Sequence, residues 1–358
     1  MGLSRIVKFF SGGTTTQAEP LDQEPRPAGA VPADLFSLAQ PTRAQKLVNS
    51  VVGGVSSWLA RPTNEMQLRL WRPHLERNKA NINHLADQFM AQWKQSGQTT
   101  RPKALVLGVG DAYDIDLAHL SRFFDLILVD IKEGVGNQAL KSIPYGQRGA
   151  SKGVQYDLTN GIIAKLLREG VEAIKANQPT EAIVDAAIEQ SRTGVDQNPF
   201  GPVDFVVSSM LMSQLGQMPL GFLRDVAQQL GRSMEKYEDL HWFDTFSKKA
   251  VLQGALIKRH VDLLKKFVLE GAWVYAATDI VLKEPTHHSI VDHSFVFDVR
   301  GAPYIELTDL IVGDEVMQVQ ALDTWEWNIE SDTKLEVQAL AMVPVGIPMI
   351  RPLPAATF

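Results

Sequence analysis

The sequence of 358 residues contains no cysteine. Disulfide bonds, thiolate metal sites and a cysteine nucleophile are therefore excluded, although an absence of cysteine does not fix the compartment. No run of uncharged apolar residues approaches the ~18 that a membrane-spanning helix requires. The apolar run at residues 6–10 is interrupted by Lys8 and is too short for a secretory signal. These absences predict a cytoplasmic protein without a membrane span.

The sequence also lacks an excess of positive charge. The formal net charge is -6, whereas nucleic-acid-binding proteins usually carry a basic face. We therefore expect no nucleic-acid partner, although a net charge does not exclude a local basic patch. The rest of the composition is ordinary for a globular protein, with 45% hydrophobic and 21% charged residues. This is enough apolar material for a core of roughly 200 residues or more.

Composition divides the chain into a leader, a helical segment, an α/β domain and a C-terminal tail, at residues 1–43, 44–100, 101–350 and 351–358. The leader is rich in Pro, Gly, Thr and Gln from residue 12 onward. Because it buries too little apolar surface to offset its ordering entropy, we expect it to be flexible. No sequence pattern in these segments predicts the oligomeric state.

The helical segment is predicted to cap the α/β domain. Pro62–Asn64 is a stop-and-start signal, and Pro73 fits the first turn of a new helix. An apolar stripe at helical spacing follows, made by Leu75, Ile82, Leu85, Phe89 and Trp93. Such a stripe shows only that one face is buried. Two interpretations stay open, a helix packed on the domain or a lid over a substrate site.

Short apolar runs alternate with helical patterns in the α/β domain. The runs lie at residues 104–109, 125–130, 154–158, 203–209 and 271–282, and the helical patterns lie at 114–124, 161–176, 218–236 and 246–270. Strands that alternate with helices indicate parallel β-α-β units. Strands that are apolar throughout are typical of a sheet covered on both faces. An extra helix is expected near residues 180–191.

The last apolar runs, at residues 304–313, 316–329 and 334–345, have no long helix between them. They predict antiparallel strands that close the sheet edge. The expected fold class is therefore α/β, a doubly wound, mostly parallel sheet with antiparallel closing strands and an N-terminal helical cap.

The ends of the first two strands carry residues typical of a ligand site. The first strand ends at Gly108 and Gly110, where glycine lets the backbone pass close to a ligand. The second ends at Asp130, at the spacing from Gly110 expected for a carboxylate that binds ribose hydroxyls. Ligands of open α/β sheets bind at the carboxyl ends of the strands, near the point where strand order reverses.

Ala112 or Tyr113 stands where a third glycine would be expected in a dinucleotide-binding turn. In dinucleotide folds that glycine lets the pyrophosphate sit on the helix N-terminus, and a cofactor without phosphate relaxes the requirement. The turn also carries Asp111, Asp114 and Asp116, which repel a pyrophosphate and suit a cation such as a sulfonium. An NAD-linked oxidoreductase is one hypothesis for this turn. The acidic residues disfavour it, and we identify no residue in the sequence that would take part in hydride transfer.

Four strand-end motifs resemble those of class I S-adenosylmethionine-dependent methyltransferases: VLGVGDA, LVDI, YDLT and VDFVVSSMLMSQL. The last is the most specific, and it is similar to the fourth-strand stretch of small-molecule and lipid methyltransferases. The resemblance covers residues 101 to about 345. It implies an enzyme that transfers a methyl group directly from S-adenosyl-L-methionine to a small-molecule or lipid-like acceptor.

The resemblance implies a set of cofactor-binding residues, Gly108, Val109, Gly110, Ala112, Asp130, Ile131, Asp157, Leu158, Ser208, Ser209 and Met210. The glycine turn would pass beneath the methionyl part of the cofactor, and Asp130 would bind the ribose hydroxyls. Asp157 would accept a hydrogen bond from the adenine amino group. Residues 208–211 would line the floor between cofactor and acceptor.

Two positions depart from the family pattern. Val106 stands where an acidic residue often precedes the first motif glycine, and Ala112 replaces the usual third glycine. Together with the long leader they also fit an alternative function, a catalytically inactive methyltransferase fold that serves as a binding or scaffold protein. The Asn/Asp-Pro-Pro-Tyr/Phe motif of amino-group methylators is absent after the fourth strand, which argues against a nucleobase acceptor.

Catalytic residues are not identified by any motif. The stretch 234–246 supplies Tyr237 and His241 as weak candidates for a general base in the acceptor pocket. A separate cluster at His287–His293 has residue types suited to zinc or iron. Ligands four residues apart converge only on a helix, and this segment reads as extended chain. We therefore expect a polar loop there and no metal site, with lining of the acceptor pocket as the alternative.

Overall fold

The computed structural model describes residues 65–193, 198, 200–240, 248–283, 317–328 and 334–351. The expected leader at residues 1–43, the apolar run at residues 304–313, His241 and the His287–His293 cluster lie outside these ranges. Within them, no helix combines the length and apolarity that a membrane crossing demands.

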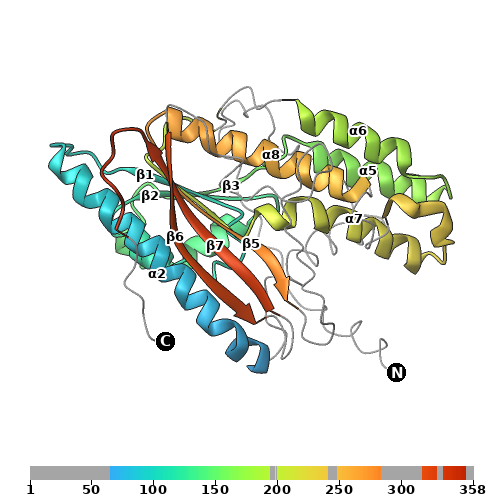
Figure 1. Ribbon diagram of the computed structural model, residues 1–358, viewed down its shortest axis with the longest axis horizontal. Coiled ribbons are helices and arrows are strands. Elements are labelled where there is room, and N and C mark those ends of the chain that lie inside the picture. The colour runs from blue at the N-terminus through green and yellow to red at the C-terminus, as the bar shows by residue number, and fades with distance from the viewer. Residues whose placement is uncertain are drawn as a thin grey trace, which may run out of the picture.

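Within the described ranges, seven strands form one sheet in the order β3-β2-β1-β4-β5-β7-β6. Their bounds are β1 Lys103–Leu107, β2 Asp125–Asp130, β3 Lys152–Gln155, β4 Phe205–Ser209, β5 Trp273–Lys283, β6 Met317–Asn328 and β7 Lys334–Pro344. The first five strands pair in parallel, and β7 runs antiparallel between β5 and β6. The prediction of a mostly parallel sheet with antiparallel closing strands is confirmed (Figure 1).

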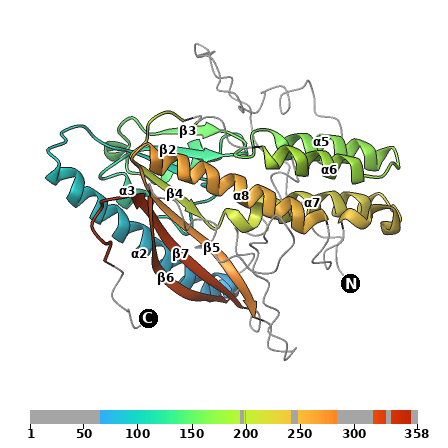
Figure 2. The ribbon, with the colours of Figure 1, turned by 45° about the horizontal axis from the view of Figure 1, so that its top comes forward.

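The principal helices are α2 Glu65–Gln95, α3 Leu117–Leu120, α4 Val135–Ala139, α5 Ile162–Lys175, α6 Glu181–Arg192, α7 Met212–Gln229 and α8 Lys248–Leu269. Between α7 and α8 lies a 3-10 segment, η5, Met234–Leu240. Helices α5 to α8 lie side by side and extend beyond the sheet (Figure 2). Their facing sides form an apolar cluster of their own.

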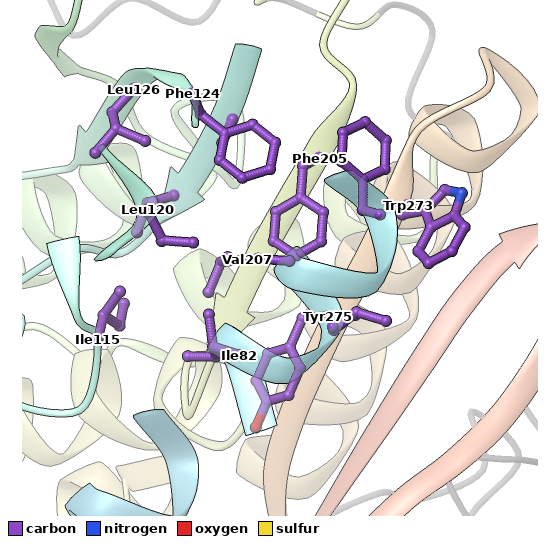
Figure 3. Packing of buried hydrophobic residues seen from close by; sticks show 14 of the residues in the cluster. Ile82, Ile115, Leu120, Phe124, Leu126, Phe205, Val207, Trp273 and Tyr275 are labelled. Atoms are coloured by element: carbon purple, nitrogen blue, oxygen red, sulfur yellow. The ribbon is translucent and has the colours of Figure 1, made fainter. Parts of the chain in front are cut away.

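Both faces of the sheet are covered, which explains strands that are apolar throughout. One face packs against α2, and Figure 3 shows Ile82 of that helix beside Phe205, Val207 and Tyr275 of the strands. The opposite face packs against α8, through residues such as Phe267. Successive residues of β1, β2, β4, β5 and β7 therefore enter different apolar clusters.

Helix α2 runs unbroken through Pro73, where the sequence predicts that a new helix begins. Proline removes one helical hydrogen bond and usually kinks or ends a helix. Tertiary contacts on both sides of it hold α2 against β6. Trp71 and His74 pack on indole rings of β6, while Arg77 and Asn81 bind Asp323 of the same strand.

Two further boundaries differ from expectation. The helix predicted over residues 114–124 is reduced to α3, because the Asp116 side chain accepts from the His119 N–H and caps the helix late. Helix α7 begins at Met212, immediately after β4, whereas the helical pattern indicates a start near residue 218. The extra helix expected near residues 180–191 is confirmed as α6.

Candidate functional site

A cavity opens at the carboxyl ends of β1 to β4. Loops after these strands supply its floor, α2 and β6 supply one wall, and α5 and α7 supply another. Its lining is Trp71, His74, Leu75, Gly108, Val109, Gly110, Asp111, Ala112, Tyr113, Asp114, Asp130, Ile131, Tyr156, Asp157, Leu158, Thr159, Ile163, Leu167, Ser209, Met210, Leu211, Leu215, Pro219, Phe222 and Trp327. Ten of the eleven cofactor-binding residues implied by the resemblance are therefore brought together.

The turn after β1 has a left-handed backbone at three alternate residues. The φ angles are +65° at Gly108, +49° at Gly110 and +53° at Ala112. A Cβ on Gly108 would lie 2.9 Å from Cδ1 of Leu211, so only glycine fits there without a shift. Ala112 adopts the same backbone region at a cost of about 1–2 kcal/mol. The turn therefore keeps its shape although the third glycine is replaced.

Asp130 ends β2 and is tied to the glycine turn. Its Oδ2 accepts the backbone N–H of Gly110 at 3.0 Å, and its Oδ1 accepts that of Lys132 at 2.9 Å. The side chain is buried, and this burial raises the pKa of Asp130 above its ordinary value. The carboxylate is thus held in one orientation at the cavity edge, with lone pairs left for a ligand.

Asp157 has a second role that the sequence pattern does not reveal. Its Oδ1 accepts the backbone N–H of Thr159 at 2.8 Å and the Thr159 hydroxyl at 2.5 Å, and its Oδ2 accepts the N–H of Ala164 at 3.3 Å. Thr159 lies in the turn before α5 and Ala164 lies in its first turn, so the carboxylate ties this turn to the start of the helix. Burial raises the pKa of Asp157.

The two serines that end β4 point to opposite sides of the strand. Ser209 lines the cavity, whereas the Ser208 hydroxyl lies 2.8 Å from Nε2 of the buried His260 on α8 and is not part of the lining. Burial lowers the pKa of His260 to about 4. Met210 follows with a φ of +51°. A left-handed Met is a costly conformation, of the kind that concentrates at functional sites.

A buried polar network links the cavity floor to α2 and β5. The Asn78 Nδ2 group donates to Ser209 Oγ at 2.7 Å and to Asp114 Oδ2 at 3.0 Å, and Ser209 Oγ donates to the same Asp114 oxygen at 2.5 Å. From β5, the Tyr275 hydroxyl donates to Asn78 Oδ1 at 2.6 Å. Burial raises the pKa of Asp114 and raises that of Tyr275 well above its ordinary value.

The wall formed by α2 and β6 is aromatic. The His74 ring stacks on Trp327 with centroids 4.3 Å apart and planes 11° apart, and Trp71 meets Trp327 edge-on at 5.2 Å. The Trp325 indole N–H donates to His74 Nδ1 at 3.0 Å. Burial lowers the pKa of His74 to about 3, so this imidazole is neutral at neutral pH.

The ionisable lining is acidic. Asp111, Asp114, Asp130 and Asp157 line the cavity, and its described lining contains no lysine or arginine. The described residues also contain no cluster of three or more side chains that could hold a metal ion.

Of the two weak catalytic candidates, Tyr237 lies among the apolar side chains of α5 to α8, fully buried and away from the cavity lining. His241 is outside the described residues.

Val106, the departure from the family pattern in β1, packs in the apolar cluster beneath α2.

Sequence reasoning missed Asn78, Tyr275, His74, Trp71 and Trp327. The helical stripe of α2, with its lid interpretation, was a signal only for the three that lie on that helix, Trp71, His74 and Asn78. The structure confirms that α2 packs on the α/β domain, whereas its role as a lid stays a prediction. Its C-terminal half packs in the core, and its N-terminal half lines the cavity.

The strand order β3-β2-β1-β4-β5-β7-β6, with only β7 antiparallel and a glycine turn after β1, is the arrangement of class I methyltransferases. The chain has the class I methyltransferase fold. No protein-family model and no curated protein matches the sequence.

Solved structures that match the chain include a SAM-dependent methyltransferase from Aquifex aeolicus, at 10% identity and a TM-score of 0.33, covering 82% of this chain and 98% of that one. The magnesium protoporphyrin IX methyltransferase from Synechocystis, with bound SAM, is 11% identical with a TM-score of 0.34 and covers 85% of this chain and 98% of its own.

Phosphoethanolamine N-methyltransferase 1 from Haemonchus contortus is 11% identical with a TM-score of 0.34, over 86% of this chain and 51% of its own. The chain spans 40% of the bifunctional kinase-methyltransferase WbdD, with 10% identity and a TM-score of 0.35.

Proposed function

We propose that this chain is an S-adenosylmethionine-dependent methyltransferase that acts on a small-molecule acceptor. The observation that carries the proposal is the hydrogen bond between the Gly110 N–H and Asp130, which joins the glycine turn of β1 to the carboxylate of β2 at the cavity edge. In a doubly wound sheet this is the place where a nucleoside lies.

The residues present fit the cofactor. Asp130 uses one lone pair on each oxygen for a backbone N–H, so further lone pairs remain for ribose hydroxyls. Gly110 leaves open space where a side chain would stand, with no heavy atom closer than 4.0 Å to a Cβ position. Ile131 and Leu158 supply apolar surface for an adenine ring.

Charge favours a sulfonium over a pyrophosphate. The lining carries carboxylates and no lysine or arginine among its described residues, so it attracts a cation and repels a dinucleotide phosphate. This supports S-adenosylmethionine over NAD. The left-handed Ala112 supports an intact turn over a degenerate one, because the backbone keeps the shape that glycine would give.

The protein contributes alignment and exclusion of water. When bound, S-adenosylmethionine supplies a methyl group: an acceptor lone pair forms the new bond to carbon, the C–S electron pair stays on sulfur, and the acceptor proton is released. Such a transfer to a good nucleophile needs little beyond orientation. For a hydroxyl acceptor, Asp114 is the lining carboxylate whose raised pKa suits proton uptake.

Isothermal titration with S-adenosylhomocysteine tests the proposal. We expect saturable binding to the folded protein and no comparable binding of NAD⁺. If the protein is folded by circular dichroism and binds no S-adenosylhomocysteine, the methyltransferase proposal is overturned and a scaffold or binding role is favoured. Transfer of a radiolabelled methyl group to a small acceptor is the second, independent readout.

A further inference from the structure

The cavity is larger than the part assigned to the cofactor, and its remaining walls differ in chemistry. Beside Asp157 and Leu158, α5 and α7 present aliphatic side chains, including Ile163, Leu167 and Leu215. These lie next to the adenine end of the site, since α5 follows β3 directly. The wall made by α2 and β6 lies past β4 and β5 in the sheet order, at the opposite end.

This second wall consists of three aromatic side chains that hold one another in place. Trp71 is 4% exposed and His74 is 2% exposed, and both contact the ring of Trp327. Rings fixed in this way lose little conformational entropy when a ligand binds, which favours affinity. A flat ligand ring can pack on such a surface by offset or edge-to-face contact.

One polar group of this wall has a defined proton position. Because the Trp325 N–H donates to His74 Nδ1, the neutral imidazole carries its own proton on Nε2. No partner for Nε2 is found among the described residues. His74, a lining residue of the cavity, therefore keeps one neutral N–H donor without a partner among the described residues.

Charge restricts the ligand further. The described residues that line the cavity include four aspartates and no lysine or arginine. An anionic group such as a phosphate would therefore be repelled and left unpaired. An aliphatic chain would gain from burial but would leave the His74 donor without a partner.

We propose that the wall formed by Trp71, His74 and Trp327 is the acceptor subsite, and that it takes an uncharged, planar, largely apolar ring bearing one oxygen or nitrogen that accepts a hydrogen bond from His74 Nε2. The role of this ligand as methyl acceptor rests on the proposed methyltransferase function. The binding itself does not.

The test uses protein saturated with S-adenosylhomocysteine and three probes measured by isothermal titration calorimetry. The probes are 2-naphthol, 2-naphthyl phosphate and 1-decanol, which separate the flat ring from charge and from a flexible chain. We expect 2-naphthol to bind, and both other probes to bind at least tenfold more weakly.

Three variants test whether 2-naphthol binds at this aromatic wall. Trp327→Leu removes the central ring and is expected to weaken 2-naphthol at least tenfold. His74→Phe keeps a flat ring without the donor and is expected to weaken it by about fivefold, the value of one net hydrogen bond. Trp93→Leu is the matched control, because Trp93 is an indole of the same helix that packs against Phe89, away from the cavity lining.

The results distinguish failure of the proposed subsite from failure of the proposed methyltransferase function. Binding of S-adenosylhomocysteine without binding of 2-naphthol overturns the subsite and leaves the methyltransferase proposal standing. Equal binding of 2-naphthyl phosphate or 1-decanol also overturns it. So does unchanged 2-naphthol affinity in Trp327→Leu, provided that the variant keeps its thermal unfolding temperature. If S-adenosylhomocysteine fails to bind, the proposed function fails, and the same probes and variants applied to the free protein still decide the subsite.

Discussion

The backbone N–H of Gly110 and the carboxylate of Asp130 are joined by a hydrogen bond of 3.0 Å, across the junction of β1 and β2. Together with the N–H of Lys132, it fixes the direction in which the carboxylate faces the cavity. The glycine turn and the acidic strand end thus form one structural unit rather than two separate motifs.

Replacement of Asp130 should therefore abolish cofactor affinity. Asp130→Ala removes the acceptor for the ribose hydroxyls, and hydrogen bonds to a charged group are each worth about 1.5–3 kcal/mol. We expect S-adenosylhomocysteine affinity to fall about a hundredfold or more, measured by calorimetry. Asp125→Ala, at the opposite end of β2 and paired with Arg101, is the control and should leave affinity unchanged. Unchanged affinity in Asp130→Ala would refute the ribose assignment.

Gly108 should tolerate no side chain. Gly108→Ala incurs the cost of a left-handed alanine and also forces its Cβ against Leu211. Gly97→Ala is matched in backbone, with a φ of +74°, but its Cβ meets nothing within 4 Å. We expect Gly97→Ala to cost about 1 kcal/mol in urea unfolding, and Gly108→Ala to cost more and to weaken cofactor binding as well. Equal effects of the two would mean that the contact with Leu211 is relieved freely.

The buried network should contribute measurably to stability. Tyr275→Phe deletes the hydroxyl that donates to Asn78 and leaves a buried acceptor unpaired. The expected loss in the free energy of unfolding is about 1–3 kcal/mol. Tyr145→Phe is the comparison, because Tyr145 is 87% exposed and should show no change. A stable Tyr275→Phe variant would show that the network is dispensable.

Stability should depend on pH through His260. Its pKa is lowered by burial from 6.5 to about 4, so below pH 6.5 the unfolded chain takes up a proton that the folded chain does not. This contribution is present above pH 6.5 and is lost as the pH falls toward 4, by about 2 kcal/mol between pH 7 and 5.

His74, with its pKa lowered to about 3, acts in the same direction. Asp114, Asp130 and Asp157 have raised pKa values and act in the opposite direction, so a single curve does not isolate one group. The measurement is the difference between wild type and His260→Gln in urea unfolding at pH 7 and pH 5. Parallel pH dependence in the two proteins would contradict the assignment.

The strands and the glycine turn were predictable because their signals are local. Apolar runs with turn residues at their ends identify buried strands, and Gly108, Gly110 and Asp130 stand at such ends. Where local signals competed with tertiary contacts, the prediction was wrong. Pro73 reads as a helix start, yet contacts with β6 carry α2 through it.

Residue type alone did not place side chains around the cavity. Ser208 and Ser209 are equivalent in the sequence, but alternation along β4 turns Ser208 to α8 and Ser209 to the cavity. Tyr237 is a plausible base by type, and its position among apolar helices removes it from the lining.

The sequence by itself determined the sheet, its closing strands and the two motifs at the ends of β1 and β2, since each depends on residues close together in the chain. The tertiary structure decided the rest of the site. The contact between His74 and Trp325 joins residues 251 positions apart, and that between Asn78 and Tyr275 spans 197. No periodicity encodes which distant side chains will meet, because that depends on how α2 packs across the finished sheet.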